Sequence, residues 1–283
     1  MQSLWMVAAS LLFACMGVCV KLGSTQFSAG ELAFYRSFIP VVLLYGYMRF
    51  AGLRLVTPHW RTHVTRGFAG FVSMVMYFYA ISLIPLATAV TLNYTSPLFL
   101  VLLLAFWQRE RVRLIIFIAI AAGFAGVALL LQPTLNAEQV AGGLFGLGSG
   151  IISSIAYLNV RKLGELGEPE WLIVFYFSLI SAIGSLPWVI SGNHAIDTRG
   201  AGLLLGVGTF GIVAQLCMTR AYKRGKTMVS ASLAYSTVVF SSIFGVWLWD
   251  ERLPPVAWAG IVLIVASGGL TSAFSRMAPV EQD

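Results

Sequence analysis

Ten apolar runs, each about as long as a membrane-spanning helix, dominate this chain. A helix needs about 20 mostly apolar residues to cross a bilayer. The runs are continuous, whereas the strands of an outer-membrane barrel are alternating segments of about ten residues, so helices are predicted. The breaks between them are short and leave no segment for a soluble domain. The predicted spans are 4–22, 31–50, 64–84, 88–107, 114–132, 140–160, 171–191, 200–222, 227–249 and 256–275.

The composition excludes several other classes of protein. Apolar residues make up 58% of the chain and charged residues only 10%, against about 25% charged in an average soluble protein. So few charges cannot coat a soluble enzyme or form a nucleic-acid-binding surface, so no nucleic-acid partner is expected. The three cysteines, Cys15, Cys19 and Cys217, all lie in apolar runs. They indicate neither a disulfide framework nor a metal site, and no cofactor is expected.

The positive charges predict the orientation of the spans. With the N-terminus inside, 14 of the 18 Lys and Arg residues, Arg66 among them, fall on one side of the membrane. Lys21, Arg199 and Arg252 fall on the other side, and Arg36 lies within a span. Lys and Arg accumulate in cytoplasmic loops. We therefore expect a multi-pass protein of the cytoplasmic (inner) membrane with both termini in the cytoplasm, its first span being retained.

The chain contains an internal repeat with an offset of 141 residues. Without a gap, several clusters fall on one another: Lys21-Leu22-Gly23 on Lys162-Leu163-Gly164, Gly67 and Gly70 on Gly208 and Gly211, Tyr94 on Tyr235, and Glu110-Arg111 on Glu251-Arg252. Each half, 1–141 and 142–283, holds five predicted spans. Because five is odd, the second half must be upside down relative to the first. The predicted fold is an all-α membrane protein of ten transmembrane helices in two inverted five-helix repeats, an arrangement typical of transporters.

A further pattern resembles a known family. A Glu follows the fourth span of each half and precedes a fifth span rich in Gly and Ala: Pro97, Glu110, Gly123 and Gly126 in the first half, and Glu251, Gly260 and Gly268 in the second. This pattern resembles the EamA family of the drug/metabolite transporter superfamily. The resemblance implies a central cavity lined by spans 1–4 and 6–9, with spans 5 and 10 at the periphery. The second half departs from the pattern, because Val238 stands where the first half has Pro97.

Two charges in the second span, Glu31 and Arg36, are candidate site residues. A charge within the membrane costs several kcal/mol and is a functional hypothesis by default. The repeat partners of Glu31 and Arg36 are Leu172 and Phe177, so the shared fold does not require charge there. Arg36 is expected to hold an anionic substrate group, and Glu31 to act as a counter-ion or proton carrier. A structural pair, or Glu31 in the headgroup layer, is the alternative.

Other candidates are polar residues at membrane depth. Asn93 and Tyr94 precede Pro97, which removes a backbone hydrogen bond, so a broken fourth span is expected to form part of a substrate site. Tyrosines offer a stacking face and a hydroxyl group to a planar substrate. The alternative for each residue is plain helix packing. The remaining candidate binding residues are Tyr77, Tyr157, Gln215 and Tyr235.

Two other motifs suggest chemistry that their context argues against. The stretch from Gly206 to Gly211 has the spacing of a dinucleotide-binding loop, but it lies in a long apolar run with no preceding strand. Its glycines are expected to permit close helix contact instead. His59 and His63 have metal-like spacing, but they are expected in a solvated, basic cytoplasmic loop.

A secondary transporter for a small organic metabolite, such as an amino acid or a vitamin, accounts best for these features. It would work by alternating access as a monomer or homodimer in the lipid bilayer, with protons as a possible coupling ion. An intramembrane enzyme is the first alternative, but no Asp or His lies well inside a predicted span to build a catalytic set. A sensor or assembly subunit is the second alternative, although it would usually carry a soluble domain.

Overall fold

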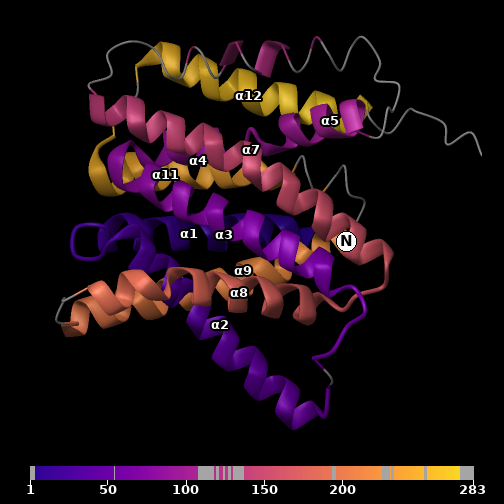
Figure 1. Cartoon of the computed structure of the whole chain (residues 1–283). Coiled ribbons are helices and arrows are strands. Elements are labelled where there is room, and N and C mark those ends of the chain that lie inside the picture. Colours follow the sequence, from indigo (N-terminus) through magenta and orange to yellow (C-terminus); the bar gives the residue numbers. More distant parts are fainter. Residues whose placement is uncertain are drawn as a thin grey trace, which may run out of the picture.

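The computed structural model is a bundle of helices, most of which run along roughly one direction, with α2 inclined to the others (Figure 1). It describes residues 4–53, 55–107, 118, 121–123, 125–126, 129, 137–192, 196–224, 230, 233–251 and 254–274. Most of the predicted fifth span lies outside these residues, and so do Glu110 and Arg111, which precede it. The described helices are α1 (Trp5–Gly23), α2 (Ala29–Ala51), α3 (Trp60–Leu83), α4 (Leu86–Asn93), α5 (Ser96–Trp107), α7 (Ala137–Glu165), α8 (Glu170–Ser191), α9 (Thr198–Arg224), α11 (Ser236–Trp249) and α12 (Pro255–Phe274).

These helices follow the predicted spans closely, so the prediction of an all-α fold is confirmed for the described residues. Each of α1, α2, α3, α7, α8, α9 and α12 corresponds to one span, whereas the fourth span is divided into α4 and α5. Among the described helices, five are long and apolar enough by themselves to cross a membrane: α1, α3, α7, α8 and α9. Helix α2 has 23 residues but includes Glu31, Arg36 and Arg49 in its apolar run.

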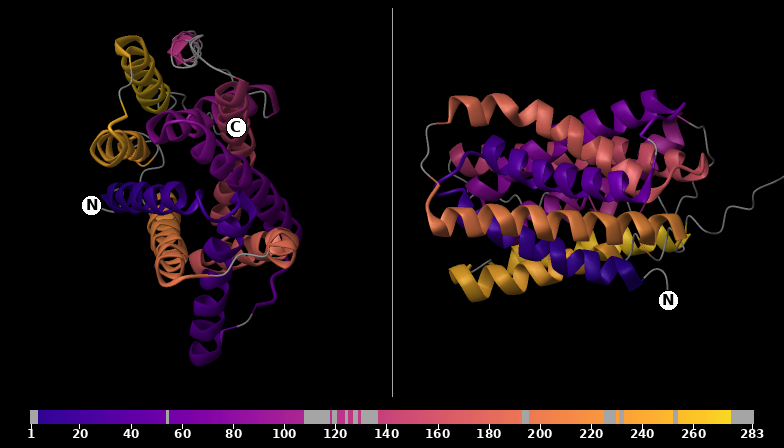
Figure 2. Two further views of the ribbon diagram at one scale, coloured as in Figure 1. Left: turned by 90° about the vertical axis from the view of Figure 1, so that its left-hand side faces the viewer. Right: turned by 90° about the horizontal axis from the view of Figure 1, so that it is seen from below.

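The packing of the helices has an approximate two-fold symmetry. Helix α3 packs along α7, and its counterpart α9 packs along α1. Helix α2 packs against α9 as α8 packs against α3, and α2 also packs against α8. Exchanging the two halves therefore maps these contacts onto one another, as the predicted inverted repeat requires. Figure 2 shows the bundle nearly end-on and from below, with α12 on the side away from α2.

Glycine permits a close approach between helices where α7 crosses the break in the fourth span. A Cβ atom on Gly150 would lie 2.6 Å from Thr95 Oγ1 and 2.8 Å from the Leu92 carbonyl oxygen. A larger residue at position 150 would collide with this backbone, so glycine lets α7 pack directly against the end of α4. The stretch from Gly206 to Gly211 also lies at a helix contact, as expected, because a Cβ atom on Gly208 would collide with Ile39 Cδ1 on α2.

The outer faces of the bundle are apolar. Trp247 is 77% exposed, Ile190 75% and Leu144 66%. Such large apolar side chains on an unpaired surface suit contact with lipid hydrocarbon rather than water.

Ionic contacts join the two halves at the end of the bundle where α1 finishes, which is the predicted external end. Lys21 Nζ lies 2.5 Å from Glu251 Oε1 and donates a hydrogen bond to the Ile84 carbonyl oxygen at 3.3 Å. The same Glu251 oxygen accepts from the Leu86 backbone N–H at 3.0 Å. One carboxylate therefore ties α1, the start of α4 and the connection before α12 together.

Glu168 makes a second set of contacts at the opposite end. Thr57 Oγ1 donates to Glu168 Oε1, and Lys223 Nζ donates to the Glu168 carbonyl oxygen at 2.9 Å. His63 Nε2 lies 3.5 Å from Glu168 Oε2. The expectation of a solvated loop was wrong for His63, because α3 begins at Trp60 and buries this side chain completely.

Candidate functional site

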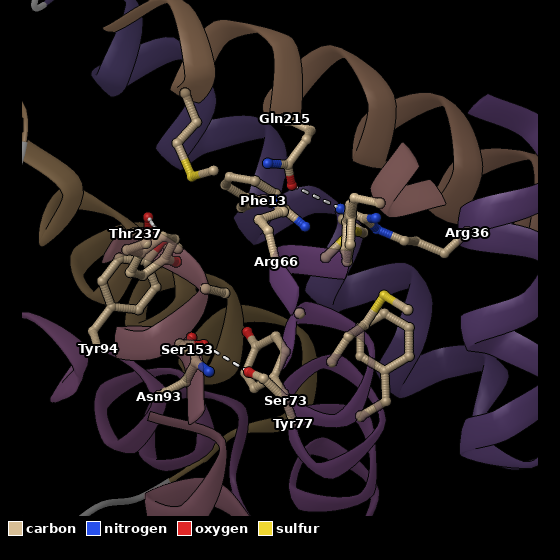
Figure 3. A pocket seen from close by; sticks show the side chains of 18 residues that line it. Phe13, Arg36, Arg66, Ser73, Tyr77, Asn93, Tyr94, Ser153, Gln215 and Thr237 are labelled. Carbon is tan, nitrogen blue, oxygen red and sulfur yellow. Dashed lines mark hydrogen bonds between the residues drawn. The ribbon is translucent and has the colours of Figure 1, made fainter. Parts of the chain in front are cut away.

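A cavity of about 100 Å³ lies between the two halves, near the middle of the bundle (Figure 3). Its lining comes from α1, α2, α3, α4, α7, α8, α9 and α11, together with Tyr94 in the break after α4. These eight helices belong to predicted spans 1–4 and 6–9. Helix α12 contributes no lining residue and packs against α4 and α5 instead. The cavity therefore occupies the place that the resemblance implied.

Two arginines form the cationic side of the cavity. Arg36, on α2, is 4% exposed, and its Nη2 donates to Gln215 Oε1 at 3.0 Å. Its Cζ lies 4.7 Å from the centre of the Phe177 ring. Arg66, on α3, is 3% exposed, and its Cζ lies 3.8 Å from the centre of the same ring. Phe177 on α8 therefore supports both guanidinium groups by cation–π contact.

Arg66 was not predicted to line the cavity, because it was counted among the charges on the cytoplasmic side. In the structure Arg66 lies inside α3 and lines the cavity together with Gly70, Ser73 and Tyr77. These four residues are spaced at four, three and four positions, which places them on one face of a helix. The same spacing is visible in the sequence, so the position of Tyr77 could have revealed Arg66.

The break in the fourth span forms the uncharged polar side of the cavity. Helix α4 ends at Asn93 and α5 begins at Ser96, which confirms the expected broken span. Thr95 Oγ1 donates to the Leu92 carbonyl oxygen at 2.6 Å, one of the groups that the break affects. Asn93 Nδ2 donates to Ser149 Oγ on α7 at 2.9 Å.

The second half has the same break without a proline. Residues 233 and 234 are helical, Tyr235 forms a turn, and α11 begins at Ser236. Ser10 Oγ on α1 lies 3.4 Å from the carbonyl oxygens of both Leu233 and Ala234. The substitution of Val238 for the proline therefore does not abolish the break.

Two tyrosines meet at these breaks. The ring centres of Tyr94 and Tyr235 are 6.3 Å apart, and Thr237 Oγ1 donates to the Tyr94 hydroxyl at 2.8 Å. Tyr94 and Thr237 line the cavity, whereas Tyr235 packs against Tyr94 and is not among the lining residues. The structure thus brings six predicted site residues to one cavity: Arg36, Tyr77, Asn93, Tyr94, Tyr157 and Gln215.

Serines that the sequence did not single out connect α3 with α7 beside the cavity. Ser73 Oγ donates to the Ser149 carbonyl oxygen at 2.9 Å and lies 2.6 Å from Ser153 Oγ. Ser73 and Ser153 line the cavity next to Tyr77 and Tyr157. Serine is common in membrane helices, so no sequence signal distinguishes these two from the others.

Glu31 lies elsewhere. Its side chain completes a capping box at the start of α2, where Glu31 Oε2 accepts hydrogen bonds from the Ser28 backbone N–H and Ser28 Oγ, both at 2.8 Å. The structure therefore does not bring Glu31 to the cavity with Arg36. Its negative charge also interacts favourably with the N-terminal end of the helix dipole.

The arrangement suits the binding of a small polar organic molecule. Guanidinium groups and the Gln215 amide supply donors on one side, and Asn93 and the Tyr94 hydroxyl supply polar contacts on the other (Figure 3). Aromatic rings between the two sides offer faces for stacking. Within the residues that the structure describes, no group of three or more His, Cys, Asp or Glu could hold a metal ion.

Comparisons with known proteins agree with this geometry. A sequence model of the EamA-like transporter family matches residues 1–132 and 140–273. The chain is 31% identical over 262 residues to the pseudopaline exporter CntI of Pseudomonas aeruginosa, covering 92% of each chain. It is 26% identical to the riboflavin transporter of Vibrio cholerae, covering 94% of this chain and 90% of that protein. A crystal structure with a TM-score of 0.71 and 19% identity, covering 97% of both chains, shares the fold.

Proposed function

Because the chain belongs to the EamA-like transporter family, we propose that it carries a small organic metabolite across the cytoplasmic membrane as a secondary transporter, by alternating access. It is a multi-pass membrane protein and a small-metabolite transporter, as its relatives are. The alternating-access mechanism and the location in the cytoplasmic membrane are the parts that we propose. The proposal also takes the cavity as the substrate site, with Arg36, Tyr77, Asn93, Tyr94, Tyr157 and Gln215 as its binding residues, Arg66 beside them and Tyr235 supporting Tyr94.

The position of the cavity on the approximate two-fold axis carries this proposal. Arg36 and Phe177 are equivalent in the 141-residue repeat, and they contact one another. Tyr94 and Tyr235 are also equivalent and also in contact. Equivalent residues can meet only near the axis that relates the halves. A site on that axis is exposed to one side or the other when one half rocks against its partner.

The charge distribution supports cytoplasmic termini, since most Lys and Arg residues then fall inside. One chain supplies all eight helices around the cavity, so a monomer is sufficient for one pathway, whether or not two copies associate.

Coupling to protons through Glu31 stays a prediction. If Glu31 carries the proton, Glu31→Gln abolishes the effect of a pH gradient on transport; unchanged pH dependence contradicts that role.

The test is uptake into proteoliposomes that contain the purified full-length chain. A panel of amino acids, vitamins and nucleosides is offered with and without a pH gradient, and empty liposomes give the background. We expect saturable uptake of at least one compound, strongly reduced by Tyr157→Ala in the cavity. Tyr45→Ala is the matched control, because Tyr45 is 49% exposed on the outer face of α2. If no compound shows saturable flux, the proposal is wrong, and a membrane enzyme or a sensor subunit becomes the better reading.

A further inference from the structure

The chemistry of the substrate can be narrowed from the two arginines of the cavity. Arg36 and Arg66 approach the same Phe177 ring, at 4.7 Å and 3.8 Å from its centre, from two different helices. Figure 3 shows both side chains at the cavity, with Gln215 beside Arg36. Two like charges are thus held close together where water is scarce, and their mutual repulsion is unfavourable.

Their hydrogen-bonding capacity is mostly unused. Arg36 Nε, Arg66 Nε, Arg66 Nη1 and Gln215 Nε2 are buried and have no hydrogen-bond partner. In the part of the chain that the structure describes, the ion pairs are Lys21–Glu251, His63–Glu168 and Arg161–Glu165, so neither cavity arginine is paired with a carboxylate. Burying an unpaired charge is strongly unfavourable, and cation–π contact with one ring compensates only part of that cost.

The fold itself does not require these charges. The repeat equivalents of Arg36 and Arg66 are Phe177 and Val207, both apolar and both buried in the second half. The same helix positions can therefore be filled by apolar side chains. Two unpaired cations at one site, where the fold accepts apolar residues, indicate that something outside the chain supplies the negative charge.

We infer that the transported metabolite is an organic dianion, with two carboxylates or a phosphate group held between Arg36 and Arg66. This inference rests on the proposed function and names the substrate class of the same site. Guanidinium groups bind carboxylate and phosphate oxygens through paired, charge-assisted hydrogen bonds. The free amide N–H of Gln215 is a further donor on the same side. Tyr77, Tyr94 and Tyr157 then contact the uncharged part of the molecule.

The first experiment measures binding rather than transport. The purified full-length protein is heated in detergent with the dianions succinate, malate or glucose 6-phosphate, with the uncharged succinamide and with the cation putrescine. Inorganic sulfate and phosphate show whether a simple anion suffices, and an added anionic phospholipid shows whether a lipid headgroup is the source. We expect at least one organic dianion to raise the Tm and succinamide and putrescine to leave it unchanged. Stabilisation by the uncharged or cationic compounds alone overturns the inference, and so does stabilisation by the phospholipid alone or by the inorganic ions alone.

Variants then test whether the arginines are responsible. Arg66→Gln and Arg36→Gln should each weaken binding of the dianion by about tenfold or more, because a charge-assisted hydrogen bond is lost. Arg66→Lys keeps the charge and should weaken it less. Arg61→Gln is the matched control, since Arg61 is exposed on the same helix. Full binding by a folded Arg66→Gln protein contradicts the assignment. If a variant fails to fold, the selectivity of the wild-type protein among the five organic compounds still decides.

The same panel in proteoliposomes separates the two proposals. Uptake of neutral metabolites without any uptake or binding of dianions overturns this inference and leaves the transport function intact. Binding of a dianion without flux of any compound overturns the transport function and leaves the dianion site intact.

Discussion

The two halves of the molecule have the same fold but contribute different residues to the cavity. Helix α2 carries Arg36 and α3 carries Arg66, and the equivalent positions on α8 and α9 are Phe177 and Val207. Asn93 at the break of the fourth span is matched by Ala234 in the ninth. In these places the first half supplies charge and hydrogen bonds, and the second half supplies apolar surface.

This difference separates the features that the repeated fold requires from the residues that are proposed to bind the substrate. The breaks at Tyr94 and Tyr235 occur in both halves, so they belong to the repeated fold. The arginines occur in one half only and act at the cavity. Substitutions that make one half more like the other therefore test the distinction directly.

Making the cavity symmetric should have the largest effect. Arg66→Val gives the first half the residue that the second half has at Val207. We expect the initial rate of substrate uptake to fall about 100-fold, because the proposed site loses a buried cation, while the protein still folds. Val207→Ile, which keeps the second half apolar, should change the rate less than about threefold. Unchanged uptake by Arg66→Val would show that the difference between the halves does not concern the substrate.

The second test compares two equivalent lysines, Lys21 and Lys162. Lys21 is tied to Glu251, whereas Lys162 is exposed. Lys21→Met should destabilise the protein by about 2 kcal/mol, because Glu251 is left mostly buried without its cation. Lys162→Met should cost less than about 0.5 kcal/mol. Thermal unfolding in detergent measures both variants; equal shifts in Tm would mean that the contact at Glu251 contributes nothing.

Removing the polar residue at the first break should have a moderate effect. Asn93→Ala reproduces the second half, where Ala234 occupies this position. The variant loses the hydrogen bond to Ser149, so we expect a loss of about 1 kcal/mol in stability and a several-fold rise in KM. Ser149→Ala removes the same hydrogen bond from the other side and leaves Asn93 in the cavity. A rise in KM for Asn93→Ala alone would show that Asn93 also contacts the substrate.

The smallest effect is expected at the cap of α2. Glu31→Gln keeps an acceptor for the Ser28 backbone N–H, so stability should change by less than about 0.5 kcal/mol. Glu31→Leu copies Leu172 of the second half and removes the capping box, at a cost of about 1 kcal/mol. Thermal unfolding distinguishes the two variants. If they are equally destabilised, charge at this position matters more than capping.

Much of the scaffold could be predicted from the sequence because membrane helices have a strong composition signal and the repeat has a constant offset. The broken fourth span followed from Pro97 and its polar neighbours. The break at Tyr235 did not, since Val238 gives no local signal for it. Equivalent packing, with Ser10 beside the carbonyl groups, replaces the proline.

The site was predictable in part. Residues well inside a span, such as Arg36 and Gln215, were found because polar groups are rare there. Arg66 and His63 were misplaced because both lie near the start of α3, where a charge in a loop and a charge in a helix look alike in the sequence. Glu31 lies near a helix end too, and only the structure shows its contact with Ser28.

The contact between Arg36 and Phe177 has a consequence for how such a chain could arise. If two identical five-helix chains formed the same bundle as a dimer, each residue on the axis would face its own copy. An arginine there would meet an arginine, and a phenylalanine would meet a phenylalanine. Joining the two copies in one gene frees each to change separately, so that a cation can face an aromatic ring. A fused chain can therefore form an asymmetric cavity, whereas a symmetric dimer of two identical five-helix chains cannot.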